Sequence, residues 1–303
     1  MRIFCLFPTL TFRPASAMMT PVFDYRLPSP GLRDYVRQLQ IVGCHFPAEM
    51  TQLPVKAYWP RAENCLSFFP RDPEQVAQGL SGPLQTSPAC RLAGQPTLLT
   101  SRHVGRDFLV LQVVFQPGAL HRLTGLPLAE LNDTLLDAET VFAGEIRQVS
   151  EQLRNTRHYP DMIPVVEAFL ARLIRRARPD YRPAFHKATE YLLCHPGQTS
   201  LDWLAGQACM SGRQFHRQFV ERQGISPKLF ARIARFGQAM RLKNAQPLTD
   251  WLSVALAVGY HDYQHLARDF RQFTGLSPNA FLLHEGQAPE RVFGQAETSD
   301  SYH

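Results

Sequence analysis

Two short stretches of the chain carry polar side chains beside apolar residues spaced as on a helix. These polar residues are Arg213, His216 and Arg217 in the first stretch, and Tyr263, Gln264, His265 and Arg268 in the second. An arginine can donate a forked pair of hydrogen bonds to guanine, and a glutamine amide can pair with adenine. A single arginine on a helix is more often only a solvated charge. Two such sets at similar positions predict contacts with the base edges of DNA.

Both sets lie in a segment that the chain repeats. The stretch from Leu204 to Phe230 recurs in altered form from Val254 to Phe281. A shift of 51 positions aligns Phe215 with Leu266, Phe219 with Phe270, Gly224 with Gly275, and Ser226-Pro227 with Ser277-Pro278. The two copies share apolar and helix-terminating residues, whereas their polar residues differ. The repeat therefore predicts one asymmetric site in two parts.

Helix-capping residues predict the local structure of each copy. Ser211 and Asp262 are N-cap residues that start the longer helices, and Gln214 completes a capping box with Ser211. Gly224 and Gly275 end these helices, and each following Ser-Pro pair starts another. Short helices are expected over 200–207 and 249–257, and a joining helix from 226 to about 242. Each copy thus predicts a helix-turn-helix unit.

The charge distribution agrees with a polyanionic partner for this region. Residues 181–284 contain 12 Lys and Arg against 6 Asp and Glu, whereas the rest of the chain contains 20 of each kind. The whole formal charge of +6 therefore lies in the repeated region. We expect affinity to depend on docking geometry as well as on attraction to phosphates.

Residues 181–284 resemble the DNA-binding domain of the AraC/XylS family. The matching stretches are LAGQACMSGRQFHRQF at 204–219, VALAVGYHDYQHLARDF at 254–270 and GLSP at 275–278. The resemblance implies a transcription regulator whose two recognition helices enter adjacent major-groove segments. Carried over by position, the seven polar residues named above fall where the family contacts bases. Tyr263 and His265 are bulkier than many members carry there, so the preferred DNA sequence does not transfer.

The N-terminal half has a β-rich pattern. Apolar runs at 64–69, 98–100 and 108–115 predict strands between turns rich in Pro and Gly. Helices are predicted over 138–153 and 163–176. The stretches at 28–36, 58–69, 92–95 and 113–127 resemble the cupin-like sensor regions of one branch of AraC-type regulators. The expected fold class is therefore α+β, with a β-rich cupin-like N-terminal domain before an all-α domain with two helix-turn-helix units.

We expect five segments along the chain. Residues 1–19 are a tail or a mis-assigned start, with Met18 or Met19 as the true start, and residues 285–303 are a disordered tail. Between them lie a sensor domain at 20–155, a linker helix at 156–180 followed by a linker near 177–182, and the DNA-binding domain at 181–284. The helix at 163–176 either forms a dimer interface or packs on its own domain.

The sequence does not favour catalysis. His45, His103 and His121 are isolated, and the chain has no Cys-x-x-Cys pair, Gly-rich phosphate loop or nucleophile elbow. Cys65 and Cys90 lack the basic and histidine context of an activated nucleophile. We expect no catalytic residue, no metal and no cofactor. The alternative is a cupin-type enzyme or metal-dependent sensor, in which His103 and His121 would bind Fe, Mn or Zn.

The N-terminal domain is expected to modulate DNA binding through a small molecule or through dimerisation, and the expected partners follow from this interpretation. They are double-stranded DNA, RNA polymerase, a small-molecule effector of unknown identity and a second copy of the chain, but no membrane. The expected location is the cytoplasm, where unpaired cysteines stay reduced.

Overall fold

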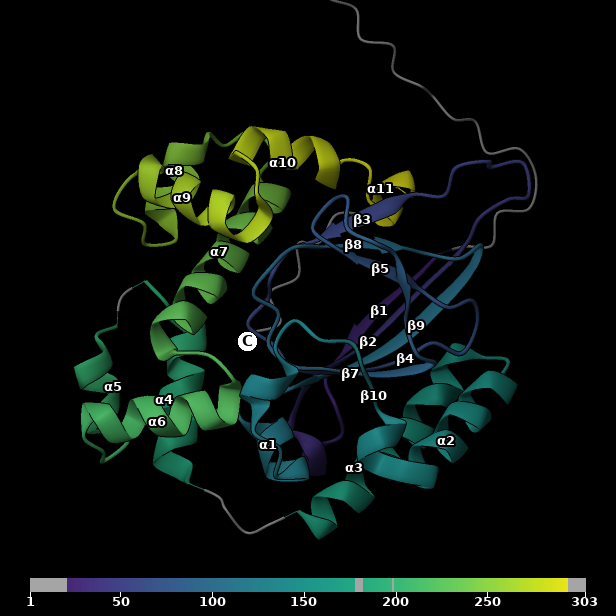
Figure 1. Cartoon of the computed structure of the whole chain (residues 1–303), viewed down its shortest axis with the longest axis horizontal. Helices are drawn as coiled ribbons and strands as arrows, with labels where there is room; N and C mark the ends of the chain where they lie inside the picture. The colour runs from purple at the N-terminus through teal and green to yellow at the C-terminus, as the bar shows by residue number, and fades with distance from the viewer. Residues whose placement is uncertain (1–20, 178–181, 198, 294–303) are drawn as a thin grey trace, which may run out of the picture.

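The computed structural model describes residues 21–177, 182–197 and 199–293 (Figure 1). An N-terminal half with two antiparallel sheets is followed by a C-terminal half made of helices. This arrangement confirms the predicted fold class. The expected start region at 1–19 lies outside the described residues, as do 178–181 of the expected linker end and 294–303 of the expected tail.

The larger sheet has six strands in the order β1-β2-β9-β4-β7-β10. These strands are β1 (Val22–Arg26), β2 (Val36–His45), β9 (Asp107–Phe115), β4 (Cys65–Phe68), β7 (Cys90–Ala93) and β10 (Leu136–Asp137). The smaller sheet has the order β3-β8-β5-β6, with β3 (Val55–Tyr58), β8 (Thr100–His103), β5 (Gln75–Gln78) and β6 (Gln85–Thr86).

Side chains on the larger sheet alternate between an apolar core and a polar interior. On β4, Leu66 and Phe68 lie in the core, whereas Cys65 and Ser67 line a cavity. The neighbouring strand β9 repeats this pattern, because Gln112 points to the cavity between core residues on either side. Successive strand residues point to opposite faces, so one face of this sheet can pack against helices while the other stays polar.

Three helices cover the apolar face of the larger sheet: α1 (Ala119–Thr124), α2 (Glu139–Asn155) and α3 (Met162–Arg176). Phe169 of α3 is buried and packs edge-on against Phe142 of α2, with ring centroids 5.7 Å apart. Glu145 of α2 also pairs with Arg172 and Arg176 of α3. The helix expected in the linker therefore packs on its own half, which covers its apolar face.

The C-terminal half contains the predicted double helix-turn-helix. Its helices are α4 (Pro183–Cys194), α5 (Leu201–Gln207), α6 (Gly212–Gln223), α7 (Pro227–Ala245), α8 (Trp251–Ala257), α9 (Tyr263–Thr274) and α10 (Pro278–Glu285). The capping predictions are confirmed: Ser211 forms the capping box with Gln214, and Asp262 caps α9. Gly224 and Gly275 end the two longer helices in left-handed conformation. The joining helix α7 runs three residues beyond the expected end.

Two predictions about local structure were wrong. The strand expected at 98–100 begins only at Thr100, because Leu98 and Leu99 form a loop that bonds to Asp133 and to Phe273. The tail expected from 285 is ordered up to residue 293, and it contains the short helix α11 (Pro289–Val292). Glu290 of α11 pairs with Lys56, and the Phe293 ring packs on Phe46.

One of the hydrophobic cores contains residues of both halves. Ala57, Trp59, Ala62 and Leu99 of the N-terminal half belong to the same cluster as the buried side chains of α4 to α10. The Trp59 ring packs edge-on against Phe281 of α10, with centroids 6.1 Å apart. This contact places the helices beside the smaller sheet (Figure 1).

Candidate functional site

Helix α6 exposes the first set of predicted residues. Phe215 and Phe219 are buried, and Arg213, His216 and Arg217 lie on the exposed side. Arg213 and Arg217 are four residues apart, so their side chains are neighbours on the helix surface. The face of α6 that does not contact the core is therefore the one that carries these donors.

Helix α9 exposes most of the second set. Gln264, His265 and Arg268 are exposed, whereas Tyr263 is half-buried and packs against the core. The His265 ring is held near the start of the helix, because its Nδ1 lies 2.9 Å from the Asp262 carboxylate. Gln264 and Arg268 thus remain the freer donors, and Tyr263 offers only part of its side chain to a ligand.

A residue that the sequence argument missed shares this face. Arg271 is exposed and lies three residues after Arg268 and seven after Gln264. Helical periodicity places all three on one stripe. The basic charge of Arg271 and its spacing were visible in the sequence, so the stripe could have been extended by one turn.

Helix α7 packs against both candidate recognition helices. It has 19 residues, which corresponds to a length of about 28 Å at the α-helical rise. α6 contacts α7 through Phe219 and Phe230, and α9 contacts it through the pairs Arg232–Asp269 and Phe236–Phe270. These contacts all lie in the half of α7 that begins at Pro227.

The turn between α8 and α9 is one residue longer than the turn between α5 and α6. The N-cap of α5 is Ser200 and that of α8 is Asp250, 50 positions later, whereas Ser211 and Asp262 are 51 apart. The extra residue therefore lies in the second turn. Cys209 in the first turn has φ 55° and Gly259 in the second has φ 83°, so both turns contain a left-handed residue.

The basic residues of this region fall into two groups. Seven of the 12 are exposed: Arg182, Lys187, Arg213, Arg217, Lys228, Arg268 and Arg271. The other five are wholly or partly buried, and they include Arg232, which bonds to Asp269 of α9 at 2.6 Å. Arg235 stacks on the Tyr260 ring at 4.1 Å. Much of the charge counted in the sequence thus holds helices together, and the recognition helices carry four of the seven exposed cations.

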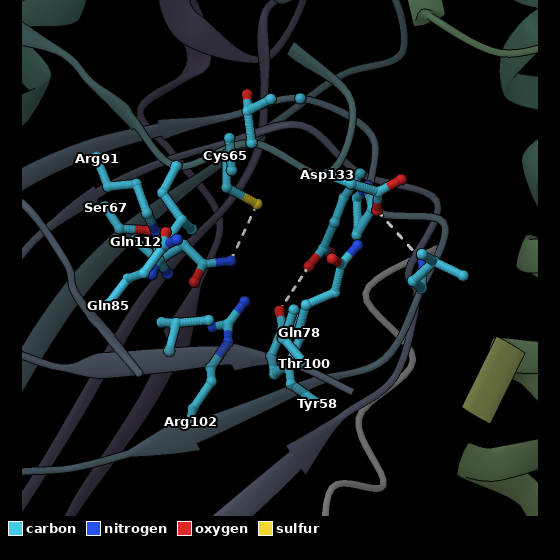
Figure 2. Close-up of a pocket in the computed structure, with 18 of the residues that line it drawn as sticks. Tyr58, Cys65, Ser67, Gln78, Gln85, Arg91, Thr100, Arg102, Gln112 and Asp133 are labelled. Carbon is cyan, nitrogen blue, oxygen red and sulfur yellow. Dashed lines mark hydrogen bonds between the residues drawn. The ribbon is translucent and has the colours of Figure 1, made fainter. Parts of the chain in front are cut away.

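A cavity of about 220 Å³ lies between the two sheets of the N-terminal half. Its wall includes Cys65, Ser67 and Gln112 from the larger sheet, and Tyr58 and Arg102 from the smaller one (Figure 2). Sequence reasoning left the effector site unknown. A sequence signal for it does exist, because Gln112 interrupts the apolar run of β9 at a position where strand alternation turns it away from the core.

Two loops connect the wall of this cavity to both recognition helices. Asp133 lines the cavity and accepts hydrogen bonds from the backbone N–H of Thr97 at 2.7 Å and that of Leu98 at 3.3 Å. The next residue in that loop, Leu99, donates its N–H to the Phe273 carbonyl of α9 at 2.9 Å. In the other loop, the Asn132 side chain donates to the Gly224 carbonyl at the end of α6 at 2.7 Å.

The histidines expected for the metal-binding alternative do not form a cluster. Within the described ranges, the group with metal-ligating geometry is His261, Asp262 and His265, whose ligand atoms lie within 4.8 Å of one another. His45, His103 and His121 belong to no such group there. Asp262 is also the N-cap of α9, and its carboxylate contacts the rings of both histidines.

The cysteines considered as nucleophiles are buried. Burial raises the pKa of the Cys65 thiol well above its ordinary value, and it also raises the pKa of Cys90. Both side chains are therefore thiols at neutral pH, which disfavours nucleophilic attack.

Among the described helices, none is both long and apolar enough to cross a lipid bilayer.

A family model described as a helix-turn-helix domain matches residues 204–284. The match spans both copies of the repeat, including the two candidate recognition helices. No curated protein matches the chain.

Three solved structures give an overall comparison. ToxT from Vibrio cholerae is 10% identical over 82% of this chain and 98% of its own, with a TM-score of 0.44. The DNA-binding domain of AdpA in complex with a target DNA is 27% identical over 34% of this chain and 93% of its own, with a TM-score of 0.32. The AraC-like transcriptional activator CuxR is 16% identical over 72% of this chain and 86% of its own, with a TM-score of 0.25.

Proposed function

We propose that this chain, a DNA-binding transcription regulator with an AraC-type helix-turn-helix domain at residues 204–284, reads a two-part asymmetric DNA site under the control of a small molecule. The observation that carries the proposal is the presence of two capped recognition helices with different exposed polar residues. Their apolar positions and caps correspond, so both helices use the same scaffold to present different chemistry.

The first part of the DNA site is read by Arg213, His216 and Arg217 of α6. Their exposure leaves their hydrogen-bonding groups accessible to a duplex. The second part is read by Gln264, His265 and Arg268 of α9, with Tyr263 contributing the exposed part of its ring. Arg217 and Arg268 are suited to guanine, and Gln264 to adenine. Arg271 at the end of the second stripe is suited to a phosphate.

The small molecule binds in the cavity between the two sheets. The loops at 96–99 and 132–135 form part of the cavity wall, and they bond to the last residues of α9 and to the end of α6. An occupant that moves either loop would change the relative position of the recognition helices. Such a change alters the fit to two groove segments at once, which gives a physical route from ligand to DNA affinity.

The remaining partners and properties extend this proposal. The protein acts in the cytoplasm, contacts RNA polymerase when bound to its target and forms a homodimer. It is not an enzyme and takes no metal or cofactor. Metal analysis of the purified protein tests the last statement, since stoichiometric Fe, Mn or Zn lost on substitution of His103 and His121 would support a metal-dependent sensor instead.

The DNA-reading assignment is tested by Arg217→Ala and Arg268→Ala. Each variant should weaken binding to the native target by about 1–3 kcal/mol and relax the preference at one base position. The target is first found by mapping the DNA occupied in the cell, and affinity is then measured by fluorescence anisotropy. Arg147→Ala on α2 is the matched control, because Arg147 is an exposed arginine far along the chain from either recognition helix. A footprint and affinity unchanged in both variants would show that α6 and α9 do not read the bases.

A further inference from the structure

The interior between the sheets has two compartments that share a wall. The cavity of about 220 Å³ and a second of about 90 Å³ are both lined by Tyr58, Arg102 and Gln112. Gln112 donates a hydrogen bond to the Cys65 sulfur at 3.0 Å, which fixes the orientation of its amide (Figure 2). The Arg102 side chain extends from β8 toward the centre of the larger cavity (Figure 2).

The acidic groups around these cavities already have partners. Glu74 accepts a hydrogen bond from Arg91 at 2.7 Å, and both side chains are buried. Glu63 pairs with Arg37 at 3.1 Å and accepts the Tyr58 hydroxyl at 2.9 Å. Asp133 is bonded to the backbone of the 97–98 loop.

Arg102 differs from these groups. Its Nε is buried without a hydrogen-bond partner, and in the described part of the chain its guanidinium forms no hydrogen bond or ion pair. The guanidinium carbon lies 3.3 Å from the centre of the Tyr58 ring, so one face is stacked while the edge is open to the cavity. Burial is the largest cause that lowers the pKa of Arg102, and the nearby charge of Glu74 acts in the opposite direction. A buried charge without a hydrogen-bonded counter-ion destabilises the fold, and an anion beside it would offset that cost.

We propose that the cavity binds a small organic carboxylate, whose two oxygens accept the forked hydrogen bonds of Arg102. A planar carboxylate matches the geometry of a guanidinium better than any neutral oxygen group does. This inference rests on the proposed function in that it names the class of the effector. The carboxylate would place its charge beside an arginine that has no hydrogen-bonded anion.

The rest of the wall restricts the ligand further. Ser67, Gln78, Thr100 and Gln112 place hydroxyl and amide groups around the cavity, and Val76 and Leu98 provide an apolar portion. A volume of about 220 Å³ is below the range of about 300–1,000 Å³ typical of sites for drug-sized ligands. The ligand is therefore a compact acid with polar substituents, and it does not carry a long hydrocarbon chain.

The test compares carboxylates with their neutral amides on the full chain. Succinate and benzoate at millimolar concentration should raise the Tm by at least about 2 °C, and succinamide and benzamide at the same ionic strength should not. Arg102→Met should abolish this rise, and Arg102→Lys should retain a smaller one because it keeps the charge but loses the fork. Arg147→Met is the control, since it removes an exposed arginine from α2.

The Tm of each variant without ligand shows whether a lost response reflects lost binding or lost folding. Arg102→Met should have a Tm equal to or above that of the wild type, because it removes an unpaired buried charge; if it fails to fold, Arg102→Lys carries the comparison. Equal responses to acids and amides, no response of the wild type to either acid, or an unchanged response in a folded Arg102 variant would overturn the proposal. A rise in Tm with no change in DNA affinity would leave the carboxylate site intact and refute its role as the effector site. If Arg217→Ala and Arg268→Ala left DNA binding unchanged, the assignment of α6 and α9 as recognition helices would be refuted. The carboxylate site would not be affected by that result.

Discussion

Asp262 caps the first turn of α9 with one carboxylate oxygen, and its other oxygen contacts the residue before it. Oδ1 accepts the backbone N–H of His265 at 2.8 Å, and Oδ2 lies 3.3 Å from the ring nitrogen of His261. These contacts lower the pKa of Asp262 from its ordinary 3.8 to about 2, and the backbone hydrogen bond from His265 is the largest cause. The carboxylate that starts the second recognition helix is thus most effective when ionised.

This shift predicts a specific pH dependence. Because the pKa is depressed in the folded protein, the stabilisation from ionised Asp262 is fully present above pH 3.8 and is lost as pH falls through about 2. Asp262→Asn keeps an N-cap acceptor but cannot titrate. We therefore expect the difference in unfolding free energy between wild type and Asp262→Asn to be constant above about pH 4 and to shrink toward pH 2. Urea unfolding across this range measures it, and a difference that stays constant down to pH 2 would contradict the assignment.

At the scale of elements, the two recognition helices end in the same way but in different surroundings. Gly224 has φ 81° and Gly275 has φ 75°, so both need the left-handed conformation that favours glycine. A Cβ on Gly224 would lie 2.4 Å from Asn132 Oδ1 and 2.7 Å from the Leu128 carbonyl oxygen, whereas one on Gly275 would meet nothing within 4 Å. The end of α6 is therefore pressed against the N-terminal half.

This difference makes Gly224→Ala and Gly275→Ala a matched pair. Gly275→Ala should cost about 1–2 kcal/mol of stability, because only backbone strain is added. Gly224→Ala adds the same strain and also forces the loop with Asn132 and Leu128 to move, so we expect a clearly larger loss. Chemical unfolding of both variants measures this. Equal losses would mean that the contact between α6 and the 128–132 loop contributes nothing to stability.

At the scale of the whole molecule, the shared core joins the sensor half to the helices. Trp59 is fully buried although it follows a strand of the N-terminal half, and its ring contacts Phe281 of α10. Chain contacts at the ends of α6 and α9 add to this connection. We infer that the two halves unfold together.

The inference predicts that Trp59→Ala destabilises the helical half from outside it. The loss should be about 3–5 kcal/mol, as for other large buried aromatic side chains. In native-state hydrogen exchange, the amides of α10 should lose protection in proportion. Trp203→Ala is the control, since Trp203 is 45% exposed on α5. If Trp59→Ala leaves α10 as protected as in the wild type, the halves are independent folding units.

The sequence predicted the helical half well for a local reason. Caps, stops and apolar spacing act within one or two turns, so Ser211, Asp262, Gly224 and Gly275 could be assigned from their neighbours alone. The β-rich half was predicted less well. The loop at Leu98–Leu99 has the composition of a strand, but its backbone bonds to Asp133 and Phe273, which lie far away in the sequence.

The amino-acid sequence by itself determined the two recognition helices, their different polar residues and the asymmetry of the site that we expect them to read. These properties depend on residue order over short distances. Only the tertiary structure decided which basic residues are exposed, because pairing such as that of Arg232 with Asp269 joins separate helices. The unpaired Arg102 and the loops that join its cavity to α6 and α9 also depend on distant segments meeting, and residue order alone does not specify such meetings.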